Sequence, residues 1–154
     1  MRIIFSLVIV FILMGCNSGE QEIIVVPKDF SGYIIVLFNQ KDGTAPIYEG
    51  NKRIYEIPKS GILRTQFESN YGMREFAEFY YEKISPETRI PSFVELKSVP
   101  SDKIVGLIGA NGTVKKSAKS EDRIEFVEFY IGTKKTIEQA QEQVEKLDIT
   151  KLAE

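Results

Sequence analysis

Residues 27–67 alternate short runs of β-forming residues with clusters of turn-forming residues. Residues 33–38 are apolar on both faces, which predicts a central strand that is covered on both sides. Residues 46–49 contain Pro46 and suit an edge strand, because proline lacks the N–H that a sheet ladder uses. Residues 53–57 alternate in the way expected of a strand with one buried face. The pattern predicts a domain built from short strands.

Turn chemistry separates these strands. Asp42-Gly43 offers a turn with positive φ. In residues 58–61, Pro58 is placed to start a type I turn and Gly61 to end it in the left-handed region. Residues 62–67 would then form the return strand, and we expect Gly61 to have a positive φ.

The remainder of the domain continues the β pattern. Residues 109–120 are rich in glycine and lysine, which predicts an exposed, mobile loop. The further predicted strands are residues 23–26, 76–83, 93–96, 103–108 and 123–131.

The pattern changes near the C-terminus, where apolar residues follow a helical stripe. Thr136 and Gln139 have the spacing of a capping box, and the helix would span residues 136–148. The stripe residues are Ile137, Ala140, Val144 and Leu147. We expect this face to pack on the sheet, with a partner-binding helix as the alternative. The predicted fold is mostly β: a single β-sandwich-like domain, loosely similar to transthyretin-like modules, with one C-terminal amphipathic helix.

Residues 1–15 have the pattern of a secretory signal peptide. Arg2 precedes the apolar residues 3–14, which only Ser6 interrupts. A helix of this length covers about 18 Å, well short of a bilayer core of about 30 Å. A spanning helix is therefore the weaker interpretation.

The four residues Leu13-Met14-Gly15-Cys16 resemble the lipobox of bacterial lipoproteins. The resemblance implies cleavage between Gly15 and Cys16, attachment of diacylglycerol to the Cys16 thiol, and fatty acylation of the new amine, with palmitate as the expected acyl group. Residues 16–22 would be the lipidated cysteine and a short polar tether, and residues 23–154 the domain. The alternative is an ordinary secreted protein with a stray cysteine. We expect a protein that is exported and lipid-anchored to a bacterial membrane.

Charge and cysteine content narrow the possible partners. Removal of Arg2 with the signal peptide changes the net charge from −2 to −3. This balance does not favour a nucleic-acid partner. Cys16 is the only cysteine, so the exported domain has no disulfide and depends on packing for its stability.

Several kinds of chemistry are excluded by composition. The chain has no histidine, and no thiol remains once Cys16 is lipidated. Catalysis by a histidine-activated nucleophile, zinc sites of the His/Cys kind, histidine-ligated haem and thiol redox chemistry are therefore ruled out. We expect no catalytic residues, no metal and no cofactor. A serine–lysine pair at Ser117 is disfavoured, because a mobile basic loop would not desolvate a lysine.

Two residue sets remain as candidates. Glu125 with Glu128, or Glu78 with Glu82, could act as a carboxylate pair like that of glycosidases, although acids along strands usually face solvent. The aromatic residues are the other set, because tyrosines on an exposed strand can stack on sugars or peptides. Most of these rings should fill the core, and the candidates for a ligand platform are Tyr80, Tyr81 and Tyr130.

The stretch P-K-D-F-x-G, followed by Y-x-I-P-K-x-G-I-L-x-T-Q-F, resembles a family of small uncharacterised bacterial lipoproteins and secreted proteins. The resemblance implies a cellular location and a shared fold, and it supplies no known activity. We therefore expect a membrane-anchored envelope lipoprotein that acts as a non-catalytic binding or structural module. Its partners would be the membrane, through the lipid on Cys16, and an envelope protein or cell-wall component. The alternatives are an inhibitor or immunity-type lipoprotein, and a carboxylate-dependent hydrolase.

Overall fold

The structure is a computed structural model, and it describes residues 18–154. The predicted signal peptide, the lipobox and Cys16 lie outside the described residues. Ser18 already pairs with Met73, so the chain is built into the domain five residues before the expected start at Ile23.

The first of two sheets has the strand order β3-β4-β1-β6-β7. Its central strand β1 runs parallel to both neighbours, β4 and β6. The proline-bearing segment lies at the edge, as predicted. The strands are β1 (Glu22–Val26), β3 (Ile47–Glu49), β4 (Lys52–Glu56), β6 (Glu78–Tyr81) and β7 (Arg89–Ile90).

The second sheet has the order β5-β2-β10-β9-β8. The apolar strand β2 lies inside it, which confirms its predicted central position. β10 runs antiparallel to both β2 and β9. The strands are β2 (Gly32–Leu37), β5 (Ile62–Arg64), β8 (Ser92–Phe93), β9 (Val105–Lys115) and β10 (Arg123–Gly132).

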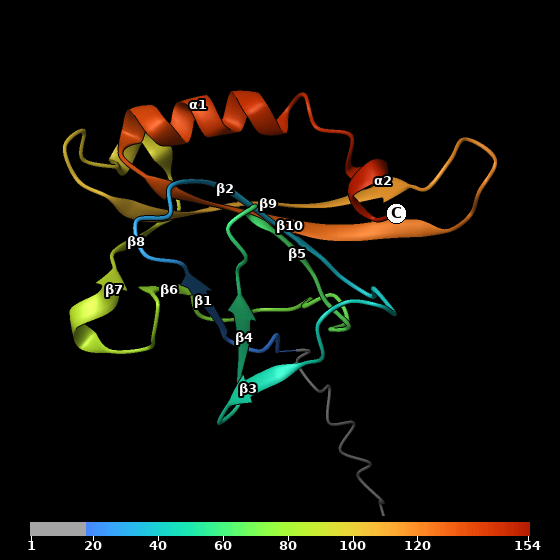
Figure 1. Cartoon of the computed structure of the whole chain (residues 1–154), viewed down its shortest axis with the longest axis horizontal. Coiled ribbons are helices and arrows are strands. Elements are labelled where there is room, and N and C mark those ends of the chain that lie inside the picture. Colours follow the sequence, from blue (N-terminus) through green and yellow to red (C-terminus); the bar gives the residue numbers. More distant parts are fainter. Residues whose placement is uncertain (1–17) are drawn as a thin grey trace, which may run out of the picture.

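The two sheets face each other, and helix α1 (Lys134–Val144) lies across the outer face of the second sheet, followed by the single turn α2 (Ile149–Leu152) (Figure 1). Two short 3₁₀ turns, Pro86–Thr88 and Leu96–Ser98, connect strands. The prediction of a mostly β, sandwich-like domain with one C-terminal amphipathic helix is confirmed.

The main core fills the space between the sheets. The rings of Phe79 from β6 and Phe129 from β10 meet edge to face with centroids 5.8 Å apart. Gly106 lies beside this pair, and a Cβ there would stand 2.4 Å from the Phe79 ring. The close approach of the sheets at this point therefore requires glycine.

Two segment predictions were wrong. Residues 62–67 do not return beside β4: β5 crosses to the other sheet and pairs parallel with β2. Residues 109–115 are not a loop but the second half of β9, paired with β10. Gly112 fits a strand here because the ring of Phe126 occupies the place of its absent Cβ, at 2.1 Å.

The helix boundaries also differ from the prediction. α1 begins at Lys134, and Thr133 is its N-cap, with its side chain accepting a hydrogen bond from the Thr136 N–H. The helix ends at Val144 rather than at residue 148. Ile137 and Ala140 are buried against the sheet, as the stripe predicted.

Candidate functional site

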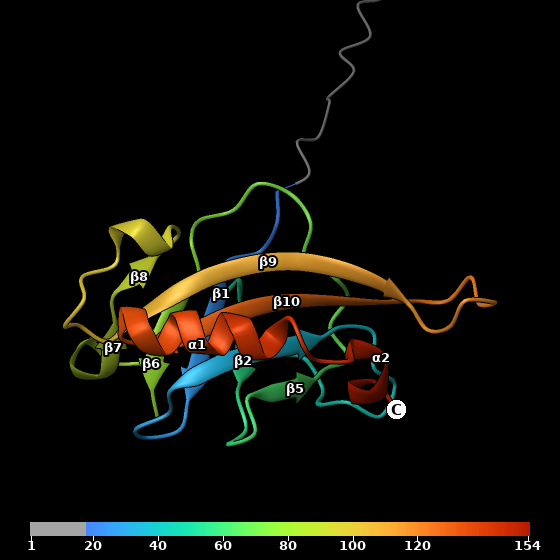
Figure 2. The same cartoon turned by 90° about the horizontal axis from the view of Figure 1, so that it is seen from above.

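The parallel pairing in the first sheet places the starts of β1, β4 and β6 at one end of the sandwich. The segment that leads into β6, residues 69–77, arches across this end beside the start of β1 (Figure 2). We call residues 69–77 the strap. It connects the second sheet to the first and lies at the point where the described chain begins.

Backbone and side-chain bonds hold the strap against residues 18–21. The Gly19 N–H donates to the Met73 carbonyl at 3.0 Å. The Glu20 N–H donates to Asn70 Oδ1 at 2.9 Å, and Asn70 Nδ2 donates back to the Glu20 carbonyl at 2.7 Å. The strap and the first described residues therefore form one bonded unit.

A buried carboxylate lies beneath the strap. Glu22 is only 2% exposed. Tyr55 Oη and Asn70 Nδ2 donate to its Oε1 at 3.0 and 2.9 Å, and Arg74 Nε donates to its Oε2 at 3.1 Å. Burial, with the nearby charge of Glu22, raises the pKa of Tyr55 well above its usual value. Both oxygens of this carboxylate are thus satisfied by donors, as a buried charge requires.

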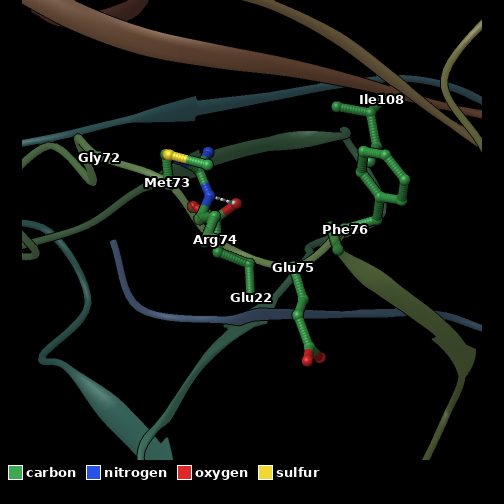
Figure 3. Close-up of a pocket in the computed structure, with 8 residues that line it drawn as sticks. Glu22, Gly72, Met73, Arg74, Glu75, Phe76 and Ile108 are labelled. Carbon is green, nitrogen blue, oxygen red and sulfur yellow. Dashed lines mark hydrogen bonds and ion pairs between the residues drawn. The ribbon is translucent and has the colours of Figure 1, made fainter. Parts of the chain in front are cut away.

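A hollow of about 280 Å³ opens beside this network (Figure 3). Phe76 and Ile108 form its apolar side, and Arg74 and Met73 stand across from them. Ligand pockets for drug-sized molecules usually exceed about 300 Å³. The hollow is a shallow amphipathic recess at the surface of the strap.

The strap binds a second carboxylate, on the other sheet. Ser69 Oγ and Tyr71 Oη each donate to Glu125 of β10 at 2.5 Å, and Asn39 Nδ2 donates at 3.1 Å. The hydrogen bonds from Ser69 and Tyr71 lower the pKa of Glu125 below its usual range. The strap therefore links the two sheets through Glu22 and Glu125.

A third carboxylate, Glu78, lies at the start of β6. It accepts from Lys52 Nζ at 2.8 Å, Gln21 Nε2 at 2.7 Å and Tyr80 Oη at 2.5 Å. Burial works to raise its pKa, but the hydrogen bonds from Lys52 and Tyr80 outweigh it and lower the pKa of Glu78.

The structure does not assemble either candidate carboxylate pair. Glu125 bonds the strap, whereas Glu128 lies in a groove beside α1 and accepts a hydrogen bond from Tyr130. Glu82 is exposed with a φ of 57°, past the end of β6. The sequence reasoning did not find Glu22, because its partners are distant in sequence.

The three tyrosines of the candidate ligand platform are not brought together. Tyr80 and Tyr81 lie on the first sheet and Tyr130 on the second. Tyr80 and Tyr130 are buried, and burial raises the pKa of each. Tyr81 is half-buried and donates to the Phe30 carbonyl at 3.1 Å. Of the three, Tyr130 lines a hollow, the groove of about 430 Å³ between β10 and α1.

Large apolar side chains stand exposed at the strap end. Met73 is 88% exposed, Phe76 67%, Tyr71 62% and Tyr48 47%. Tyr48 of β3 belongs to the same end, because it pairs with Arg53, which pairs with Glu22. Tyr71 and Phe76 belong to the aromatic set noted in the sequence, but nothing in the sequence marks Met73.

Within residues 18–154, no helix is long and apolar enough to cross a membrane. The same part of the chain contains no group of three or more histidine, cysteine, aspartate or glutamate side chains that could hold a metal ion.

Comparison with known proteins gives a family and a fold. The profile of a family of unknown function, DUF6843, matches residues 18–141. A crystal structure named "Putative Lipoprotein from Bacillus anthracis" is similar with a TM-score of 0.51 and 12% sequence identity, over 73% of this chain and 69% of that one. No curated protein matches the sequence.

Proposed function

The chain belongs to the DUF6843 family of unknown function, and from this premise we propose that it is a lipid-anchored module of the bacterial cell envelope that binds another envelope component without catalysis. The family match and the similar Bacillus anthracis structure fit an uncharacterised lipoprotein. The anchor, the absence of catalysis and the binding surface are the three parts of the proposal.

The anchor is supported by position. The apolar segment 3–14 leads into the lipobox-like Leu13-Met14-Gly15-Cys16. Ser18, two residues after Cys16, already pairs with Met73 of the domain. A diacylglycerol on Cys16 with an acylated amine would supply the two or more chains that stable anchoring needs.

The state of the carboxylates supports a non-catalytic role, and this observation carries the proposal. Glu22, Glu78 and Glu125 each accept three hydrogen bonds from side chains. Glycoside hydrolysis by a pair of carboxyl groups needs one acid whose pKa is raised so that it can donate a proton. The pKa values of Glu78 and Glu125 are instead lowered. These carboxylates serve to hold segments together.

The groove beside α1 is the binding surface that we propose. Its apolar side chains are Phe126, Tyr130, Val144 and Ile149, and two carboxylates, Glu128 and Glu145, lie among them. An apolar floor with acidic groups suits a segment of an envelope protein that carries apolar and basic side chains. α1 lies on the outer face of the second sheet and β1 lies in the first sheet (Figure 1), so the second sheet separates the groove from the start of β1, where the anchor would be.

The anchor is tested by Cys16→Ser, with Ser18→Ala as a neighbouring control. We expect Cys16→Ser to remove the protein from the membrane fraction of the bacterium, and Ser18→Ala to leave it there. An unchanged membrane fraction for Cys16→Ser would contradict lipid anchoring.

The binding surface is tested by a photo-crosslinking amino acid in intact cells. Gln141 lines the groove, whereas Gln139 on the same helix is exposed and outside it, so the two glutamines are a matched pair. We expect a specific adduct from position 141 and none from 139. Equal labelling from both positions would reject the groove.

The identity of the adduct separates the alternatives. A single stoichiometric envelope enzyme would favour an inhibitor or immunity role. Hydrolysis of cell-wall glycan by the purified protein, abolished by Glu125→Gln, would instead overturn the non-catalytic proposal.

A further inference from the structure

The three most exposed large apolar side chains in residues 18–154 lie near Ser18, whereas the less exposed Val94 and Ile104 lie beside β8 and β9. These three, Tyr71, Met73 and Phe76, belong to the strap, and Tyr48 stands on the neighbouring strand β3. Met73 pairs directly with Ser18. Large apolar patches on soluble proteins usually mark an interaction surface.

The distance to the anchor limits what can cover this patch. Cys16 precedes Ser18 by two residues, which span at most about 7 Å of extended chain. A lipid on Cys16 would therefore hold the strap end of the domain at the bilayer surface, within reach of the headgroup and acyl boundary.

The strap that carries the patch is hydrogen-bonded to both sheets. Asn70 and Arg74 fasten the strap to the buried Glu22, and Tyr71 is fastened to Glu125 through its hydroxyl. The exposed residues are thus presented on a strap that is bonded to both sheets. Tyrosine beside an anchor matches the aromatic belts that proteins place at membrane interfaces, and phenylalanine is common on the apolar face of segments that lie in the interface.

Charge at this end does not favour adhesion to anionic lipid. The cations Lys52, Arg53 and Arg74 are each paired with a carboxylate: Glu78, Glu20 and Glu22, respectively. An attraction to anionic headgroups would need free basic groups. The strap also carries an exposed acid, Glu75, so contact with the bilayer depends on the apolar and aromatic side chains.

We infer that the strap end of the domain rests on the lipid bilayer that holds Cys16, with Met73, Phe76 and Tyr71 inserted into the interface. The inference rests on the lipid anchor proposed above and adds a second, non-covalent contact with the same membrane. It gives the domain a fixed orientation, with the groove beside α1 left free for a partner.

Tryptophan provides the test, because the chain contains none. The mature, lipidated protein carrying Met73→Trp is reconstituted into vesicles of zwitterionic phosphatidylcholine with brominated acyl chains, which quench tryptophan at the interface. Lys59→Trp is the control, since Lys59 is exposed in the loop that follows β4, at the opposite end of the parallel strands. Phe76→Trp is a second probe on the patch.

We expect tryptophans at positions 73 and 76 to lie about 5–10 Å deep in the interface, so that brominated lipid quenches about half of their fluorescence. The fluorescence of tryptophan at position 59 should not change. Flotation of the vesicles reports the anchor separately. Protein that floats with the vesicles but shows no quenching at 73, or equal quenching at 73 and 59, overturns the inference while the anchor stands. Protein that does not float overturns the anchor and the contact together. A patch covered by a second copy of the chain would give the unquenched result.

Discussion

Gly61 shows most directly how one residue fixes a turn. Its φ is 78°, its N–H donates to the Pro58 carbonyl at 2.9 Å, and its carbonyl accepts from the Ile35 N–H at 2.9 Å. The predicted positive φ is confirmed. A Cβ at this position would also lie 2.4 Å from the Tyr33 carbonyl oxygen, which sequence reasoning could not show.

Gly61→Ala should therefore destabilise the fold by more than the cost of a left-handed backbone conformation alone. We expect a loss of about 3 kcal/mol in the free energy of unfolding, measured with urea, from the left-handed conformation together with the collision. Gly50 is the matched control, because its φ is 62° but nothing lies within 4 Å of its missing Cβ. Gly50→Ala should cost about 1 kcal/mol. Equal losses for the two variants would show that the collision is relieved by movement.

The buried Glu22 depends on Arg74 for its charge balance. Arg74→Met should lower the free energy of unfolding by about 3 kcal/mol, because it leaves a buried carboxylate without its cation. Lys97→Met removes the exposed pair with Glu95 and should cost less than about 1 kcal/mol. A loss for Arg74→Met as small as the loss for Lys97→Met would mean that Tyr55 and Asn70 suffice for Glu22.

The turn at Gly61 was predicted from its neighbours, but the positive φ predicted for Asp42-Gly43 was wrong: neither residue has one, and a Cβ at Gly43 would lie 2.7 Å from the Arg64 backbone. Gly61 and Pro58 act within one turn, so residues 58–61 alone are enough to predict its conformation. Glu22 lies in a run that looks like the end of a polar tether. Its partners Tyr55, Asn70 and Arg74 lie 33 to 52 positions away, and only the fold brings them together.

Among the elements, the strap is the one whose side chains link the two sheets. It has no regular secondary structure of its own between β5 and β6. Its order comes from side chains that bind one carboxylate on each sheet. Protonation of Glu125 should therefore weaken the attachment of the strap to the second sheet.

The strap predicts a pH dependence of stability through Glu125. Its pKa is lower in the folded protein than in the unfolded chain, where it is about 4.3. Its contribution is therefore present above that value and is lost as the pH falls through the folded pKa. The stability difference between the wild-type protein and Glu125→Gln should shrink between pH 6 and pH 3, as measured by urea unfolding.

Glu56 provides the control for this measurement, because it is an exposed glutamate on a strand. Glu56→Gln should follow the acid dependence of the wild-type protein. A constant difference between the wild-type protein and Glu125→Gln across this pH range would contradict the assigned role of Glu125.

Strand positions were predictable where periodicity and turn residues agree, as in β2, β4 and β10. The pairing of the strands was not. β4 and β5 are joined by a turn that reads like a hairpin, yet they lie in different sheets. The second half of β9 reads like a loop, because its glycines suit the rings of β10 rather than a flexible chain. The first error concerns a partner, β2, that β3 and β4 separate from β5 in the chain, whereas the second concerns the strand that directly follows β9.

At the scale of the whole molecule, the chain moves repeatedly between the two sheets. β1 lies in the first sheet, β2 in the second, β3 and β4 in the first, and β5 in the second again. Neither sheet can form from one continuous segment. We expect a single cooperative unfolding transition in urea, with far-UV and near-UV circular dichroism coinciding. Two separate midpoints would show that one sheet survives without the other.

The fold class and the predicted anchor could be derived from composition and short motifs, because strand propensity and an apolar leader are local properties. The candidate membrane face could not. It depends on which strand starts meet at one end, and therefore on the parallel pairing of β1 with β4 and β6.

That pairing also decides how the domain bears mechanical load. β1 is the middle strand of its sheet, and the chain enters it from Ser18, the end nearest Cys16. A pull at this end acts along the axis of β1 and shears its hydrogen bonds to β4 and β6 together, rather than opening them one at a time. The strand closest to the anchor is thus the one best placed to resist extraction, so tension between a bound partner and the membrane would be borne by two ladders at once.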